Sequence, residues 1–272
     1  MNFEDYIKLH DCKPFEKTEQ SQTFTVIRDG KKRFIKKYSF NFDRAKEELA
    51  YTYINSMDFL NILRPTMVGE DFIEIEFLHH SAIPKGKEII EGISKMYTET
   101  LNDSKPKSYF PIIDLSKNKL FRRLEYIPIE LKKRGFIESN LLKMSWDFVN
   151  SIYRIPDHYC LVHGDLKSSH IIKTEGEIFF IDLALVSVAN PWYDLAFLYM
   201  ERKDKGFALD KLCRDSFDVL GKNLDVNMED IKDYLQSAIF YRSLYDVIFA
   251  LRHRPEKTLR RTIKDLMGIV TH

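Results

Sequence analysis

Two aspartates stand where buried strands are expected to end. Asp165 comes shortly after the apolar run 159–162, and Asp182 directly follows the apolar run 178–181. A carboxylate beside a buried strand is costly unless it binds a cation or accepts hydrogen bonds. The pair therefore predicts a functional site in which carboxylate oxygens meet a metal ion or a polar substrate.

Common nucleotide-binding and hydrolase signatures are absent from the chain. The sequence contains neither the GxxxxGK[ST] phosphate loop nor GxGxxG, which excludes P-loop kinases and Rossmann dehydrogenases. It also lacks the HExxH zinc motif and the GxSxG nucleophile elbow. The two aspartates must therefore serve another kind of site.

Three linked motifs follow one another between residues 163 and 196. The first is His-Gly-Asp-Leu-Lys-Ser-Ser-His at 163–170, the second is the apolar strand that ends at Asp182, and the third is Tyr-Asp-Leu-Ala at 193–196. They resemble the HGDxxxxN, IDW or IDF, and YDLA motifs of the aminoglycoside phosphotransferase and choline kinase family, and the rest of the chain agrees in order and spacing. The resemblance implies an α+β, bilobal, protein-kinase-like fold and the transfer of phosphate to a hydroxyl group.

The resemblance gives the two aspartates different roles. Asp165 matches the catalytic aspartate, which accepts the proton of the acceptor hydroxyl and orients it toward the γ-phosphate of ATP or GTP. Phosphoryl transfer depends mainly on positioning and charge stabilisation. Asp182 matches the aspartate that holds Mg²⁺ between the phosphates, and oxygen ligands suit magnesium. We therefore expect Mg²⁺ as the cofactor and a nucleoside triphosphate as the phosphoryl donor.

His170 departs from the family pattern. Most members have asparagine five residues after the catalytic aspartate, where it binds the second metal ion. Imidazole is a softer ligand than magnesium usually takes. Macrolide kinases also carry histidine at this place, so the resemblance still implies an active kinase. Two interpretations of His170 follow: a metal ligand, or a loop histidine that hydrogen bonds to the backbone.

His163 and Asp194 are expected to support the site without touching the substrate. By the resemblance, His163 braces the catalytic loop, and Asp194 accepts hydrogen bonds from the backbone of that loop while it caps the next helix. Helix capping alone, after Pro191, is the alternative role for Asp194.

A lysine and a glutamate are expected to fix the phosphates. The run 33–38, Arg-Phe-Ile-Lys-Lys-Tyr, resembles the family's strand that ends in the phosphate-binding lysine, and its apolar positions favour Lys36 over Lys37. Adjacent residues of a strand lie on opposite faces, so only one of them enters the site. The partner of this lysine should be Glu47 or Glu48 on the next helix, and the family spacing favours Glu48.

Two further segments are expected to contact the nucleotide. The turn 18–23 takes the place of the phosphate-binding loop; it has no glycine, and the hydroxyl groups of Ser21 and Thr23 can meet the phosphates. An ordinary polar turn is the alternative. Residues 76–78 form the expected hinge, whose backbone groups meet the edge of the base; they are Glu76, Phe77 and Leu78.

The first part of the chain is expected to form strands and one helix. Residues 24–38 contain two β-rich runs joined by Asp29-Gly30, which is a strong hairpin signal. The run 72–78 alternates apolar and acidic residues, as a half-buried strand does. Between these strands we expect a helix over 43–56 whose apolar stripe includes Leu49, Tyr53 and Ile54.

After Pro84 the apolar residues recur at helical spacing. A β island at 159–182 interrupts it, and Pro128 is expected to break one of the helices. This order predicts a nucleotide-binding lobe over 1–80, with a hinge near 76–80. A helical lobe over 81–272 should then hold the catalytic loop 163–170 and the metal-binding strand end at 182.

Composition limits the cellular setting and the partners. The chain has 272 residues, of which 44% are hydrophobic, and no apolar run of about 20 residues that would span a membrane. Its N-terminus has no signal-peptide pattern, and its three cysteines are far apart, which fits a reducing cytoplasm. With 42 Lys and Arg against 41 Asp and Glu, the net charge of +1 argues against general polyanion binding.

The basic residues are nevertheless unevenly distributed. Residues 241–272 hold seven Lys and Arg against three acids, whereas aminoglycoside kinases of the family hold polycationic sugars with carboxylates in this region. An aminoglycoside-like small molecule is therefore one expected acceptor, and an anionic acceptor such as a lipopolysaccharide core sugar or an RNA 2′-hydroxyl is the other. A nucleotide-binding pseudokinase and a metal-dependent hydrolase are the rival functions.

Overall fold

The computed structural model describes residues 1–17, 21–58, 61–79, 81–135, 139–174 and 176–270. Thr18–Gln20 of the predicted phosphate loop and His80 of the predicted hinge lie outside the described residues. The chain forms two compact units, each built from two stretches: Met1–Glu99 with His163–Val186, and Thr100–Val162 with Ser187–His272. These units group the catalytic-loop segment with the N-terminal residues, and the division into lobes at residue 80 stays a prediction.

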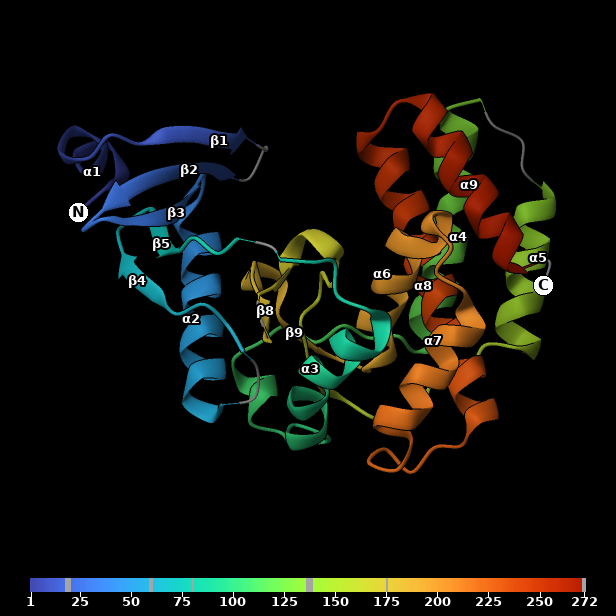
Figure 1. Cartoon of the computed structure of the whole chain (residues 1–272). Helices are drawn as coiled ribbons and strands as arrows, with labels where there is room; N and C mark the ends of the chain where they lie inside the picture. Colours follow the sequence, from blue (N-terminus) through green and yellow to red (C-terminus); the bar gives the residue numbers. More distant parts are fainter. Residues whose placement is uncertain (18–20, 59–60, 80, 136–138, 175, 271–272) are drawn as a thin grey trace. The chain divides into compact units, whose positions relative to one another are not determined.

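The first unit contains a five-stranded antiparallel sheet in the order β1-β2-β3-β5-β4 (Figure 1). Its strands are β1 Lys13–Lys17, β2 Ser21–Arg28, β3 Lys31–Tyr38, β4 Pro65–Val68 and β5 Phe72–Glu76. Asp29 and Gly30 have φ of 53° and 72°, the backbone that a tight two-residue hairpin turn requires. The predicted hairpin therefore forms, and it places β3 in the middle of the sheet.

The two faces of β3 carry different chemistry because side chains alternate along a strand. Ile35 is fully buried in a cluster formed by residues of the sheet and of helix α1 (Phe3–Leu9); its members are Phe3, Tyr6, Val26, Ile35 and Phe72. Phe34 and Lys36 lie on the opposite face, where both line a cavity. The apolar cluster thus holds the strand that presents Lys36.

Helix α2 (Asn41–Met57) packs against β3, β5 and the short 3₁₀ turn Leu183–Leu185. Its buried positions include Glu47, Ala50, Tyr51 and Ile54, which recur at the helical spacing of three and four residues. Leu49, expected on the inner stripe, is exposed. Tyr53 and Ile54 of the expected stripe are buried, but the buried stripe includes Glu47 and not Leu49, so Glu47 is the glutamate that faces inward.

The remaining elements of the first unit hold the catalytic-loop segment. The 3₁₀ turn Ser168–His170 leads into β7 (Ile171–Lys173), which pairs with β8 (Ile178–Phe180). Helix α3 (Gly86–Glu99) approaches so closely that a Cβ atom at Gly92 would lie 3.2 Å from the ring of Phe180. Phe180 also donates its backbone N–H to the carbonyl of Asn61, just before β4. These contacts fix β8, the strand that leads to Asp182.

The second unit is mainly helical, and it contains a two-stranded pair of β6 (Cys160–Val162) and β9 (Ser187–Ala189). Its α-helices are α4 Lys117–Lys133, α5 Ser139–Ser151, α6 Trp192–Arg202, α7 Leu209–Ser216, α8 Met228–His253 and α9 Glu256–Val270. Pro128, expected to break a helix, lies inside α4, because its buried neighbours Leu124, Ile127 and Leu131 hold that helix in the core.

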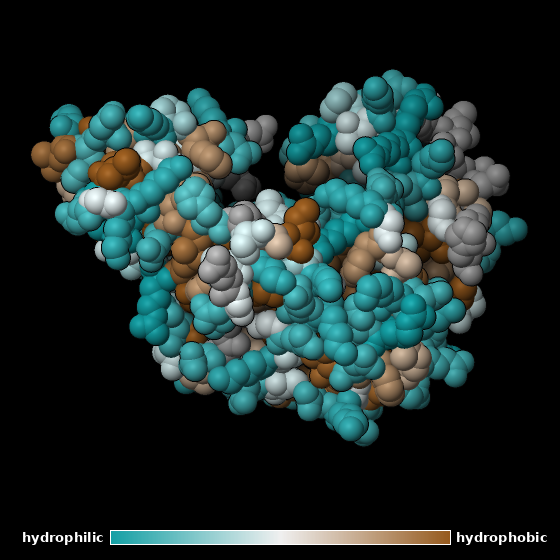
Figure 2. All heavy atoms as spheres, in the orientation of Figure 1, coloured by the Kyte–Doolittle hydropathy of each residue, from teal (hydrophilic) through white to brown (hydrophobic). Residues whose placement is uncertain are grey.

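The surface and the core follow ordinary hydropathy. Hydrophilic residues cover most of the visible face of each unit (Figure 2). Among the residues that the structure describes, no helix is both long and apolar enough to cross a membrane.

Candidate functional site

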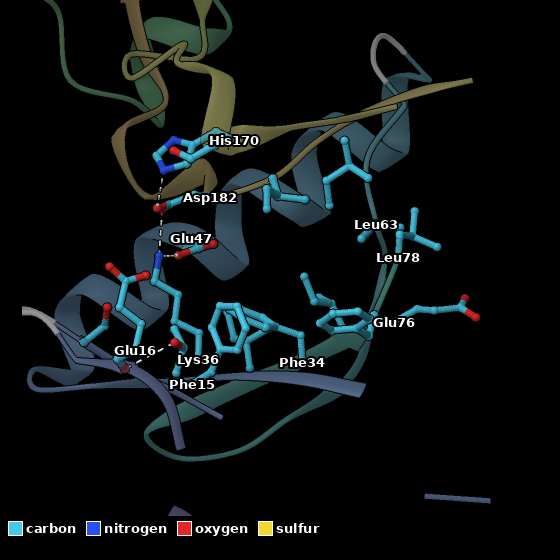
Figure 3. Close-up of a pocket in the computed structure, with 18 of the residues that line it drawn as sticks. Phe15, Glu16, Phe34, Lys36, Glu47, Leu63, Glu76, Leu78, His170 and Asp182 are labelled. Atoms are coloured by element: carbon cyan, nitrogen blue, oxygen red, sulfur yellow. Dashed lines mark hydrogen bonds and ion pairs between the residues drawn. The ribbon is translucent and has the colours of Figure 1, made fainter. Parts of the chain in front are cut away.

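Lys36 connects two acidic residues from distant parts of the chain within the first unit. Its ammonium lies 2.8 Å from Glu47 Oε2 on α2 and 2.6 Å from Asp182 Oδ1, which follows β8 (Figure 3). Glu47 also accepts a hydrogen bond of 2.6 Å from the hydroxyl group of Tyr38. The sheet, the helix and the β7–β8 pair thereby converge on one ammonium group.

The predicted partner of Lys36 was wrong by one residue. Glu48 lies 2.5 Å from Arg44 on the outer side of α2, whereas Glu47 is almost fully buried and contacts Lys36. The reason is the phase of α2, in which Glu47 shares the buried stripe with Ala50 and Ile54. A step of one residue rotates a side chain by about 100° around a helix, which separates the two glutamates.

Charge pairing controls the ionisation of Asp182 and Lys36. Burial alone would raise the pKa of Asp182, but the Lys36 ammonium outweighs it and lowers this pKa to about 2. Burial alone would likewise lower the pKa of Lys36, but Glu47 and Asp182 raise it above its ordinary value. Both groups are therefore charged near neutral pH, as a site for phosphates and a cation requires.

His170 lies between the two aspartates. Its Nδ1 is 3.0 Å from the backbone carbonyl oxygen of Asp165, and its Nε2 is 3.1 Å from Asp182 Oδ2. Burial lowers the pKa of His170, so the ring is neutral near pH 7. Because a carbonyl oxygen only accepts, Nδ1 carries the proton and Nε2 presents a lone pair to Asp182. One ring nitrogen of His170 therefore hydrogen bonds to the backbone, as one of the two interpretations expected. The other ring nitrogen faces a carboxylate.

The residues present fit a divalent cation. Two donors, His170 Nε2 and Asp182 Oδ2, converge without a proton between them. Within the described part of the chain, no group of three or more His, Cys, Asp or Glu is arranged to hold a metal ion. A cation bound through two protein ligands would take its other ligands from phosphates and water, which is the usual arrangement for Mg²⁺ with nucleotides.

Asp165 has a cationic neighbour that the motif analysis missed. Lys167 Nζ lies 2.7 Å from Asp165 Oδ2, and the side chain of Lys167 also lines the cavity that contains Lys36. Its position two residues after Asp165 in an otherwise polar loop was the available signal. A cation at this place both orients the carboxylate and provides positive charge for an anionic substrate.

His163 ties the catalytic loop to the end of β8. The ring is fully buried, its Nε2 donates to the carbonyl oxygen of Ile181 at 3.0 Å, and its Nδ1 accepts from the backbone N–H of Asp165 at 3.4 Å. Gly164, with φ of 83°, approaches Leu185 so closely that a Cβ atom would collide with the Leu185 carbonyl oxygen. These contacts couple the positions of Asp165 and Asp182.

Asp194 belongs to the second unit, where it lies fully buried in the first turn of α6. The cap position of this helix is Pro191, which makes no side-chain capping bond, so Asp194 is not the cap residue. Its negative charge lies at the positive end of the helix dipole. The contact of Asp194 with the catalytic loop stays a prediction.

A cavity of about 440 Å³ in the first unit joins these charged groups to an apolar region. Lys36, Glu47, Lys167, His170 and Asp182 line its polar end. Its apolar lining includes Phe34, Leu63, Ile73, Ile75, Phe77 and Leu78. The predicted residues Ser21, Thr23 and Glu76 line the same cavity.

The apolar end includes two aromatic residues that the sequence analysis did not single out. Phe15 of β1 and Phe34 of β3 have ring centroids 5.9 Å apart in an edge-to-face arrangement, and both line the cavity (Figure 3). The period of two along β3 places Phe34 on the same face as Lys36. A cavity with one apolar, aromatic end and one cationic end suits a ligand that joins a planar base to phosphates.

Comparison with known proteins agrees with this architecture. A model of the phosphotransferase enzyme family matches residues 106–220. No curated protein sequence matches the chain. Among solved structures, a macrolide 2′-phosphotransferase of Brachybacterium faecium has a TM-score of 0.73 at 12% identity, over 96% of this chain and 95% of that one.

Two further solved structures extend the comparison. The GDP and kanamycin complex of an aminoglycoside 2″-phosphotransferase has a TM-score of 0.67 at 14% identity, over 96% of this chain and 93% of that one. A choline kinase of Cryptosporidium parvum has a TM-score of 0.67 at 11% identity, over 97% and 89%. The predicted α+β, protein-kinase-like fold and the resemblance to this group of phosphotransferases are confirmed.

Proposed function

We propose that this chain, a protein-kinase-like phosphotransferase by its family match and fold, transfers the γ-phosphate of ATP or GTP to a hydroxyl group of a small or sugar-containing molecule. The observation that carries the proposal is the unbroken line of contacts from Glu47 through Lys36, Asp182 and His170 to Asp165. This line connects a phosphate-binding cation, a cation site and a proton acceptor within one unit. A cytoplasmic location, where nucleoside triphosphates are abundant, is part of the proposal.

The cavity supports a nucleotide in one orientation. Its apolar end accepts the base, next to the backbone of Glu76, Phe77 and Leu78, while the Glu76 side chain itself is exposed. Lys36 at the other end contacts the phosphates, and the hydroxyl groups of Ser21 and Thr23 line the same side of the sheet. Glu47 and Asp182 hold Lys36 in place, so the ammonium is already positioned before the nucleotide binds.

Asp182 and His170 would hold Mg²⁺ through Oδ2 and Nε2. A bound divalent cation neutralises charge on the phosphate oxygens. The protein's own task is to keep these two donors fixed, and it does so through hydrogen bonds to Lys36 on one side and to the Asp165 carbonyl on the other.

Asp165 is the proposed catalytic residue. Its carboxylate accepts a hydrogen bond from the acceptor hydroxyl, orients the hydroxyl oxygen and takes up its proton as the new phosphate ester forms. Lys167 holds one carboxylate oxygen at 2.7 Å and leaves the other available for the acceptor. His163 fixes the loop from behind through Ile181.

The neutral or cationic small-molecule acceptor is favoured over the anionic one. Three of the seven basic residues in 241–272 form ion pairs within the second unit: Arg242 with Asp246 at 2.9 Å, Arg260 with Glu256 at 2.5 Å and Arg261 with Asp204 at 3.0 Å. Paired charges attract an anion less than free ones do. The proteins of similar fold named above act on macrolides, an aminoglycoside and choline, which supports the same choice.

The proposal is tested by binding first and by transfer second. Thermal unfolding is measured with ATP, GTP and non-hydrolysable analogues, with and without Mg²⁺; a ligand at 100 times its Kd stabilises the protein by about 2.7 kcal/mol. Transfer of γ-³²P phosphate is then screened across aminoglycosides, macrolides, amino alcohols, sugars, core oligosaccharide and RNA. Absence of any nucleotide-dependent stabilisation contradicts the proposal. If only RNA or core oligosaccharide is labelled, the acceptor is anionic and the proposed small-molecule acceptor is wrong.

A further inference from the structure

We infer that the cation site formed by His170 and Asp182 selects Mn²⁺ over Mg²⁺. The inference rests on the proposed nucleotide site and deepens it, since it concerns which ion accompanies the nucleotide. It comes from three features of the described residues: the direction of the imidazole lone pair, the spacing of the two donor atoms, and the restraints that hold both in place.

The first feature is that His170 has only one ring nitrogen available. Nδ1 faces the backbone carbonyl oxygen of Asp165 at 3.0 Å and donates its proton there. Nε2 is thereby left as the donor of electrons, and it faces Asp182 Oδ2 at 3.1 Å. Two lone pairs that point at each other repel unless a proton or a metal cation lies between them, so a cation that binds nitrogen and oxygen together would stabilise the arrangement.

The second feature is the spacing of these donors. Neighbouring ligands of an octahedral ion, each about 2.1 Å from the ion and at right angles to each other, are about 3.0 Å apart. The separation of 3.1 Å between Nε2 and Oδ2 matches this value. The pair can therefore occupy two adjacent positions of an octahedral ion without moving.

The third feature is that neither donor can easily turn away. The His170 side chain is only 10% exposed, and its ring is stacked beside the ring of His163 with centroids 5.9 Å apart. Asp182 uses its other oxygen, Oδ1, to accept from Lys36 at 2.6 Å. The imidazole nitrogen therefore stays in its coordination position. An oxygen ligand at the same position would suit a harder ion better.

The chemistry of the ligands then distinguishes the ions. Mg²⁺ prefers oxygen ligands throughout, whereas imidazole suits first-row transition ions. Mn²⁺ shares with Mg²⁺ the preference for carboxylate, phosphate and water oxygens in octahedral geometry. As a first-row transition ion it also forms a bond to imidazole nitrogen, which the harder Mg²⁺ forms only weakly. A mixed site of one imidazole, one carboxylate and nucleotide phosphates therefore favours Mn²⁺.

The test measures ion binding directly, apart from activity. The full-length protein is saturated with a non-hydrolysable ATP or GTP analogue, and Mn²⁺ and Mg²⁺ are titrated calorimetrically into the wild type and His170→Asn. The wild type should bind Mn²⁺ more tightly than Mg²⁺, and His170→Asn should reduce this preference about tenfold or more. In pulsed electron paramagnetic resonance of the Mn²⁺ complex, wild type should show coupling to a directly bound ¹⁴N nucleus, and His170→Asn should not.

A matched control removes a histidine from elsewhere. His253→Asn, at the exposed end of α8, should leave the ion preference and the ¹⁴N coupling unchanged. His170→Gln serves as a second variant, because a longer amide can supply oxygen to the ion if His170→Asn fails to fold. Nucleotide binding with an unchanged ion preference and no ¹⁴N coupling in wild type overturns the inference alone. Failure of the nucleotide to bind at all overturns the proposed function and the inference with it.

Discussion

The ammonium of Lys36 lies 2.6 Å from Asp182 Oδ1, although 146 positions of sequence separate the two residues. The contact joins the central strand of the sheet to the end of β8, and Glu47 completes it from α2. One cation thus holds three elements of the first unit together, and changes to its partners should be detectable both in function and in stability.

The adjacent glutamates of α2 provide a matched comparison. Glu47→Gln removes the buried charge that holds Lys36, so we expect nucleotide affinity and transfer rate to fall by about 10- to 100-fold. Glu48→Gln removes only the partly buried pair with Arg44, away from Lys36, and should change either quantity by less than about twofold. Nucleotide titration and steady-state kinetics of both variants show which glutamate is the functional partner of Lys36. A larger effect of Glu48→Gln would identify Glu48 as this partner, as first predicted from the sequence.

The depressed pKa of Asp182 predicts a dependence of stability on acid. This carboxyl group titrates at about 2 in the folded protein and near its ordinary value of 3.8 when unfolded. A lowered folded pKa stabilises the protein at pH above about 4, and this contribution is lost as the pH falls from about 4 toward 2. The side chain is 35% exposed, so solvent screening reduces the size of the effect. Urea unfolding at several pH values should show a smaller loss over this range for Asp182→Asn than for wild type; equal slopes would contradict the assigned pairing.

Asp165→Asn tests the proposed proton acceptor. The amide retains most of the shape of the carboxylate but cannot take up the hydroxyl proton, so turnover should fall by about 10²- to 10⁴-fold. Nucleotide affinity should stay within about twofold, because Asp165 itself does not line the nucleotide cavity. An unchanged turnover number would remove Asp165 from the catalytic role.

Lys167 should act mainly on turnover. Its ammonium holds Asp165 at 2.7 Å and faces the cavity, so Lys167→Met should lower kcat by about 100-fold and change the KM for the acceptor much less. Lys167→Arg keeps the charge and should restore part of the rate. Lys173→Met, which breaks an ion pair with Glu88 in the same unit, is the control for a general loss of charge. If Lys167→Met and Lys173→Met behave alike, Lys167 has no special role.

Two glycines with similar backbone angles allow the cost of backbone strain to be distinguished from the cost of a steric collision. Gly30 and Gly164 have φ of 72° and 83°, but only at Gly164 would a Cβ atom meet another atom, the Leu185 carbonyl oxygen. Alanine at Gly30 should cost about 1–2 kcal/mol from the backbone alone. Alanine at Gly164 should cost at least about 1 kcal/mol more, because Leu185 must move away. The free energies of unfolding of the two variants in urea give the comparison directly.

Local sequence signals predicted much of this molecule. The Asp29-Gly30 turn fixed the hairpin, since few residues adopt its positive φ angles. The motifs at 163–170 and 182 identified charged residues that the fold indeed brings together. In each case the signal is local: a turn, or a short segment whose own residues contain the chemistry.

What the sequence did not predict depends on packing between distant segments. The rotation of α2 is set by contacts with β3, β5 and the turn 183–185, and apolar periodicity alone placed Leu49 inside. Pro128 stays within α4 because buried residues on both sides of it hold the helix, which outweighs the lost hydrogen bond. The pairing of Lys167 with Asp165 depends on a loop conformation that no periodic pattern describes.

The two-stretch composition of the first unit has a consequence for synthesis. A ribosome makes Lys36 and Glu47 early, but residues 100–162 of the other unit emerge before His170 and Asp182 do. The N-terminal sheet must therefore wait for a late segment before its central lysine acquires its second acidic partner. Pairing across so many residues slows folding. Nascent chains that end before residue 182 should be unable to bind nucleotide, so this binding can begin only after Asp182 has been made.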